Sequence, residues 1–166
     1  MRRAAVPIAF SQGFTPHPKI SYASAAPTGV GSEAEYLEIG LRAEVDPDEL
    51  RVALDAALSP GLDVLEAVVA GEGSLADRID ASRWVIEQSD VPSGADGTPC
   101  AIIELVVRQV TPAVRPDDVL SGLRVVAGLE PPVPSRVTRL AQGTLTTAGD
   151  IVDPLDADRT SLPSGI

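Results

Sequence analysis

The residues best suited to chemistry lie together in one early stretch, residues 10–22. It contains His17 and Lys19, which are the only histidine and the only lysine of the 166 residues. Gly13 allows close approach of the backbone to a ligand. Further polar groups come from three neighbours: Ser11, Gln12 and Thr15. Together these are parts of an anion-binding site, although no helix starts at the spacing of a phosphate-binding loop.

Aromatic residues gather in the same region. Aromatics make up 3% of the chain, and four of the five fall between residues 10 and 36: Phe10, Phe14, Tyr22 and Tyr36. Phe14 and Tyr22 could stack on a base or another planar ligand. The candidate binding residues are therefore Ser11, Gln12, Gly13, Phe14, His17, Lys19 and Tyr22.

Two prolines stiffen this stretch. Pro16 and Pro18 each push the preceding residue away from helical backbone angles, so Thr15 and His17 are held extended. Three interpretations remain open: a rigid turn whose aromatics fill the core, a binding loop, or a directly catalytic loop. The sequence shows no second base or nucleophile near His17, so no catalytic residue is assigned.

The distribution of charge limits the class of partner. Residues 1–30 contain three cations and no carboxylate, whereas the whole chain has a net charge of −11 and a pI near 4.4. Nucleic-acid affinity depends on many Lys and Arg contacts with phosphates, so any such contact must be local. Glu33 and Glu35 share one side of an extended segment and are more typical of a solvated surface than of a paired-carboxylate site.

The single cysteine, Cys100, excludes an internal disulfide, a thiolate zinc site and iron–sulfur ligation within this chain. No cofactor or metal site is therefore expected here. Pro7 and the polar residues 11–13 interrupt the first apolar run, which is therefore shorter than the apolar segment of a signal peptide. No apolar run of greater length follows in the sequence. We expect a soluble, cytoplasmic protein.

Periodicity predicts alternating strands and helices. Strands are expected at 8–10, 20–24, 35–42, 62–69, 83–87, 102–109 and 135–145. Asp46 and Pro47 predict the start of one helix, and Pro116 to Gly128 delimit a second. Residues 89–99 are expected to be a linker, and Trp84 a core residue.

An internal repeat is the basis of the fold prediction. Residues 36–42 align with 102–108, and residues 45–50 align with 114–119. The second match alone could reflect a common helix start, but the preceding strand matches too. We predict an α+β fold of two ferredoxin-like (split βαβ) halves, each incomplete. The first half spans 1–72 and lacks its first strand and most of its first helix, the second spans 73–145, and 146–166 form a mobile tail.

A known family resembles this chain. The motif Phe10-Ser-Gln-Gly-Phe-Thr-Pro-His-Pro-Lys-Ile-Ser21, followed by residues 32–39, resembles the radical SAM-associated proteins, a bacterial family of unknown function. Residues 103–143 are most similar to its actinobacterial members. Family members usually begin with a further strand and helix ending in Arg-Arg-Ala, so the resemblance implies a shortened N-terminus. They also have more chain between the Trp84 strand and the Ile102 strand.

The resemblance implies a function. Family members are encoded beside a radical SAM protein or fused behind one, so we expect an accessory or substrate-presenting module that is not catalytic by itself. The iron–sulfur cluster and SAM would belong to that partner, and residues 11–19 would contact substrate or partner. The alternative is an RNA or modified-nucleotide binding protein that presents aromatics locally. An enzyme acting alone would need another catalytic group near His17.

Overall fold

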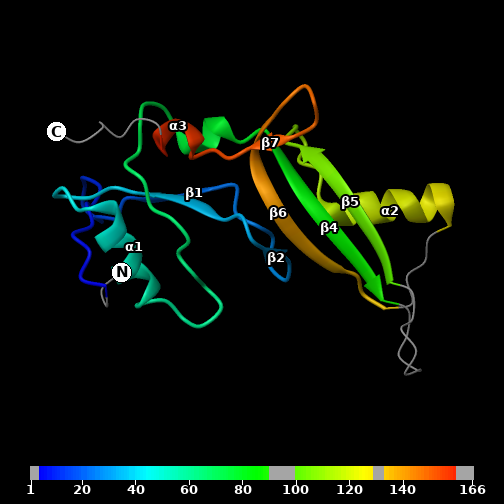
Figure 1. The fold of residues 1–166 in the computed structure, drawn as a ribbon, viewed down its shortest axis with the longest axis horizontal. Helices are drawn as coiled ribbons and strands as arrows, with labels where there is room; N and C mark the ends of the chain where they lie inside the picture. The colour runs from blue at the N-terminus through cyan, green and yellow to red at the C-terminus, as the bar shows by residue number, and fades with distance from the viewer. Residues whose placement is uncertain (1–3, 90–99, 129–132, 160–166) are drawn as a thin grey trace. The chain divides into compact units, whose positions relative to one another are not determined.

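The computed structural model describes residues 4–89, 100–128 and 133–159, and the chain divides into two compact units. Unit 1 consists of Met1–Ala23, Tyr36–Leu75 and Leu155–Ile166, and unit 2 of Ser24–Glu35 and Ala76–Pro154. Figure 1 shows that both units contain sheet and helix. The mixed α and β class predicted from periodicity is confirmed.

Unit 1 is built on an antiparallel pair of strands, β1 (Ile20–Ala23) and β3 (Tyr36–Ile39). A third extended segment joins them through isolated bridges from Ile8 to Leu41 and from Phe10 to Pro18. The strand predicted at 20–24 is therefore confirmed, and the one predicted at 35–42 is confirmed over 36–39, whereas 8–10 forms only single bridges. Pro7 and Pro18 lack the N–H groups that a longer ladder would need.

Helix α1 (Pro47–Asp55) begins as its sequence predicts. The Asp46 carboxylate accepts hydrogen bonds from the backbone N–H groups of Asp48 and Glu49 at 2.9 and 3.1 Å. This cap satisfies two donors that the first helical turn leaves free. Leu54 is the buried residue of this helix.

The strand expected at 62–69 is wrong. These residues form no strand or helix, and Leu62, Leu65 and Val69 are exposed. Side chains hold the backbone instead: Asp55 accepts the N–H of Val64 at 2.8 Å, and Asp158 accepts that of Gly71 at 3.1 Å. A β-prone sequence becomes a strand only where a partner strand offers a free edge, and no strand among the described residues pairs with this segment.

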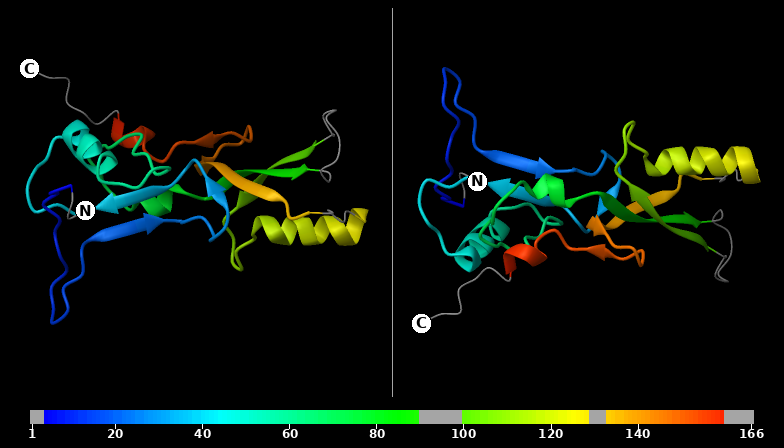
Figure 2. Two further views of the ribbon diagram at one scale, coloured as in Figure 1. Left: turned by 90° about the horizontal axis from the view of Figure 1, so that it is seen from below. Right: turned by 90° about the horizontal axis from the view of Figure 1, so that it is seen from above.

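Unit 2 is built on three long antiparallel strands in the order β6–β4–β5. They are β4 (Ala81–Ser89), β5 (Cys100–Arg108) and β6 (Arg136–Leu145). Because β5 and β6 both pair antiparallel with β4, on its opposite sides, they run parallel to each other. Helix α2 (Pro116–Ala127) connects them and lies on one side of the sheet (Figure 2).

The helix connecting these strands ends as predicted. Gly128 has a φ of 65° and donates its N–H to the Arg124 carbonyl at 3.1 Å. Trp84 and Ile86 are buried on the sheet, which confirms the core position expected for Trp84. Two short strands extend the sheet at β6: β2 (Gly31–Ser32) pairs with it in parallel, and β7 (Ile151–Val152) pairs antiparallel.

Shorter elements lie near the ends of the units. A 3-10 helix, η1 (Leu75–Arg78), follows the irregular segment of unit 1. The expected tail from residue 146 contains β7 and a short helix, α3 (Asp156–Arg159), whose Arg159 binds the carboxylate of Glu66. Most of the predicted 89–99 linker lies outside the described residues.

Candidate functional site

The predicted binding loop is anchored where three extended segments of unit 1 meet. Three backbone hydrogen bonds of 2.8 Å link these segments in a ring: Ala9 N–H to the Gly40 carbonyl, Gly40 N–H to the Lys19 carbonyl, and Lys19 N–H to the Ala9 carbonyl. Gly40 is needed here, because a Cβ atom at this residue would lie only 2.9 Å from the Lys19 Cβ. The ring fixes the backbone that carries Lys19.

The loop itself, residues 10–22 and here called the His17 loop, is closed at its base. The Ser11 N–H donates to the His17 carbonyl at 2.8 Å, and the His17 N–H donates to Ser11 Oγ at 3.0 Å. Gly13 turns the chain with a φ of 131°, a conformation that side-chain-bearing residues rarely adopt. The stiff turn expected from Pro16 and Pro18 is thus supported by side-chain and backbone bonds.

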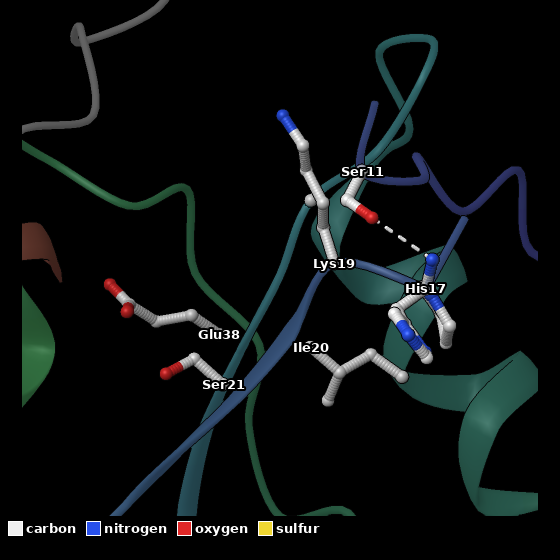
Figure 3. Close-up of a pocket in the computed structure, with 8 residues that line it drawn as sticks. Ser11, His17, Lys19, Ile20, Ser21 and Glu38 are labelled. Carbon is white, nitrogen blue, oxygen red and sulfur yellow. Dashed lines mark hydrogen bonds between the residues drawn. The ribbon is translucent and has the colours of Figure 1, made fainter. Parts of the chain in front are cut away.

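A shallow concavity of about 370 Å³ lies beside this loop. Its lining residues are Ser11, His17, Pro18, Lys19, Ile20, Ser21, Glu38 and Gly40. Figure 3 shows the Lys19 side chain and the His17 ring pointing in different directions, with Ser21 and Glu38 side by side at a distance from the imidazole. The two scarce ionisable groups therefore border one hollow without converging on one point.

The seven candidate residues divide into two groups. Ser11, His17 and Lys19 line the concavity, whereas Gln12, Gly13, Phe14 and Tyr22 do not. Phe14 has a relative exposure of 109% and Tyr22 of 65%, so neither ring belongs to the core. The interpretation in which the aromatics of this turn fill the interior is wrong for these two rings.

Sequence reasoning missed the contribution of β3 to this hollow. Glu38 comes into the site because the strand register places it opposite Ser21. One Glu38 carboxylate oxygen accepts the Leu75 N–H at 3.2 Å, so this acid also holds local structure. The alternation of residues 36–42 separates Glu38 from Leu37 and Ile39, but it contains no information about which strand will lie alongside.

The acids at 33 and 35 serve different purposes. Glu35 forms an ion pair with Arg139, and Glu33 is exposed. The pair is part of unit 2 and holds the segment 24–35 against β6. A structural role for Glu35 explains the carboxylate without a paired-acid catalytic site.

The chemistry of the His17 loop favours contact over group transfer. The imidazole makes no hydrogen bond to any described residue, and Ser11 Oγ is occupied by a backbone N–H. Within residues 4–89, 100–128 and 133–159, no group of three His, Cys, Asp or Glu side chains is placed to hold a metal ion. A nucleophile oriented by a base, the arrangement that covalent catalysis uses, is not formed by these loop residues.

The fold and the loop define a mixed α and β protein that presents a rigid, aromatic-tipped loop. The chain belongs to a family of uncharacterized proteins conserved in bacteria (DUF2344), which matches residues 1–116. This match contains the whole His17 loop and ends at the first residue of α2. The chain matches no curated protein and no solved structure. In the described part of the chain, no helix is long and apolar enough to span a bilayer.

Proposed function

We propose that this chain is a cytoplasmic, non-catalytic accessory module that uses the His17 loop to contact a radical SAM protein or to present its substrate. The single observation that carries the proposal is the full exposure of Phe14 at the tip of a loop that is pinned at its base. The choice of partner comes from the resemblance of residues 10–21 to radical SAM-associated proteins. The iron–sulfur cluster and SAM would be held by that partner.

Phe14 has the physical character of an interface anchor. Burying a phenylalanine side chain contributes about 1.5–3 kcal/mol, and aromatic anchors often dominate the energetics of protein interfaces. The hydrogen bonds between Ser11 and His17 hold the loop before any partner arrives. Less conformational entropy is then lost on binding, which favours affinity.

The fold is also part of this proposal. The parallel relation of β5 and β6 across β4, with α2 between them in sequence, supports a split βαβ unit in the second half. A ferredoxin-like relation between the two halves, by internal repeat, remains a prediction. It is supported by the matching helix starts at Pro47 and Pro116.

Replacing Phe14 is the direct test of the loop. We expect Phe14→Ser to weaken copurification with a radical SAM protein of the kind that the resemblance implies by at least about tenfold, because the anchor is removed. His17→Ala combined with Lys19→Ala should weaken it further. Affinity chromatography from cells expressing both proteins, followed by titration of the purified pair, measures the effect.

Leu65→Ser is the matched control for this test. Leu65 is 80% exposed in the same unit but lies outside the His17 loop, so its replacement should leave copurification unchanged. Equal capture of the wild type, Phe14→Ser and the His17/Lys19 double variant would refute a role of the loop in partner contact.

A second candidate function is binding of RNA or a modified nucleotide. The specific observation in its favour is the exposure of both Phe14 and Tyr22 near Lys19, since exposed rings stack on single-stranded bases. We expect weak binding of a single-stranded RNA in a mobility assay, with a log–log salt slope of only about −1 to −2, because few cations are present. Tyr22→Ser should reduce it. A steep slope, or binding unaffected by Tyr22→Ser and Phe14→Ser, would exclude this mode.

A further inference from the structure

Unit 2 contains a second and larger cavity, of about 490 Å³, that is separate from the His17 loop. Four segments form it: the end of β5 with the turn that leads into α2, the face of β4 that carries Trp84, residues 24–28, and β6 at Arg139. We call it the Arg108 pocket. Its lining residues are Ser24, Ala25, Pro27, Thr28, Ser82, Trp84, Val107, Arg108, Gln109, Val110, Ala113, Val114, Arg115, Pro116 and Arg139. The volume is in the range of small-molecule sites.

The charge of this lining is opposite to that of the protein. Three arginines and no carboxylate line the pocket, although the chain has 24 acids and a net charge of −11. Arg139 is neutralised by Glu35, whereas Arg108 and Arg115 form no ion pair with any described residue. Two uncompensated guanidinium groups at one cavity are a site for an oxyanion, which guanidinium binds through paired N–H groups.

The acidic residues that follow Arg115 in the sequence do not line the Arg108 pocket. Asp117 and Asp118 follow Arg115 on the first turn of α2, but neither lines the pocket. Asp118 accepts the backbone N–H of Arg115 at 2.8 Å, so this carboxylate acts as a helix cap. The guanidinium of Arg115 remains available.

A hydroxyl group in the lining can hydrogen-bond a ligand. Ser82 is only 6% exposed and lines the pocket, yet its hydroxyl makes no hydrogen bond to any described residue. The hydroxyl is therefore available to a ligand in the pocket.

The other lining residues include apolar side chains that can contact the apolar part of a ligand. Trp84 is buried, and the Arg139 guanidinium makes a cation–π contact with its ring at 5.5 Å from the ring centroid. Val107, Val110 and Val114 add apolar surface near the two free arginines. A ligand that fits this lining combines a charged oxygen group with a flat or branched apolar part.

We propose that the Arg108 pocket binds a small organic oxyanion, a carboxylate or phosphate monoester with an apolar body. Arg108 and Arg115 hold the charged group, Ser82 hydrogen-bonds the ligand, and Trp84 with the valines contacts the apolar part. This site is independent of the proposed function of the His17 loop, because none of its lining residues belongs to that loop. Failure of one proposal leaves the other standing.

Because Trp84 is the only tryptophan of the chain, its fluorescence reports binding at this pocket. Trp84 lines the pocket, so its fluorescence should change on titration of the full chain with phenyl phosphate or benzoate and reach saturation. Arg108→Gln and Arg115→Gln should each weaken binding about tenfold, as expected for a lost charge-assisted hydrogen bond. Ser82→Ala should weaken it about threefold to tenfold. Saturation with either anion supports the proposal.

Arg124→Gln is the matched control, since this arginine is exposed on α2 in the same unit and outside the pocket lining. It should bind both anions like the wild type. Arg108 and Arg115 are exposed, so their variants should keep the wild-type circular dichroism and unfolding midpoint. The proposal is overturned if neither anion gives a saturable signal. It is equally overturned if phenol binds as tightly as phenyl phosphate, or if the folded Arg108/Arg115 double variant binds like the wild type.

Discussion

Gly143→Ala is expected to destabilise unit 2 by about 3 kcal/mol or more, although it adds a single methyl group. Gly143 is buried in β6, where it pairs with Ala81. A Cβ atom at this position would overlap the carbonyl oxygen of Val152 and lie 3.0 Å from its carbonyl carbon. The obstacle is backbone, so no rotamer change relieves it, and either β7 leaves or the β6 ladder shifts.

Urea unfolding followed by Trp84 fluorescence measures this effect, because Trp84 lies on β4 beside β6. Gly122→Ala is the matched control. Gly122 lies inside α2 with nothing within 4 Å of the added methyl group, so the same substitution there should stabilise by up to about 1 kcal/mol. Similar midpoints for the two variants would show that the close approach of β7 to β6 is not formed.

Arg139→Leu is expected to cost about 3 kcal/mol, because Arg139 is the group that holds segment 24–35 in unit 2. Its side chain is 2% exposed. It donates to the Ser24 carbonyl at 2.6 Å and to Ser32 Oγ at 3.2 Å, and it pairs with Glu35. Removing one partner of a buried ion pair costs about 3–5 kcal/mol; we expect the lower end because the Glu35 side chain is 43% exposed and can be solvated.

Arg136→Leu provides the comparison within the same strand. The Arg136 side chain is 82% exposed and lies 3.9 Å from the Glu87 carboxylate, so its loss should cost less than about 1 kcal/mol. Urea midpoints give the energies, and hydrogen exchange of segment 24–35 reports its release in Arg139→Leu alone. If the two variants lose the same free energy of unfolding, the bonds from Arg139 to Ser24, Ser32 and Glu35 do not stabilise unit 2 as their geometry implies.

Much of the secondary structure could be predicted because its signals are local. The Asp46 cap with Pro47, and Gly128 at the end of α2, each act within one helical turn. The long strands of unit 2 follow from period-two alternation. The expected strand at 62–69 failed because strand formation needs a neighbouring edge, which residues within the segment cannot specify.

The candidate site was predicted in part. The stiffness of the His17 loop follows from its prolines, whereas the exposure of its rings was left open by the sequence and came from the structure. Ser11, His17 and Lys19 do share one hollow. Glu38 entered it only through strand register. The Arg108 pocket was not predicted at all, because residues 24–28, 82–84 and 107–116 are far apart in the chain.

The sequence by itself determined the caps, the turns, the alternation and the place where scarce cationic and aromatic residues collect, since each depends on a few neighbouring residues. Only the tertiary structure decided that Arg139 would be buried against Glu35 and Trp84, and that Arg108, Arg115 and Ser82 would line one pocket. The physical reason is that pairing and burial are set by contacts between distant segments. The sequence shows that a residue is arginine, but it does not show whether the side chain will form a buried ion pair, line a cavity or be exposed to solvent.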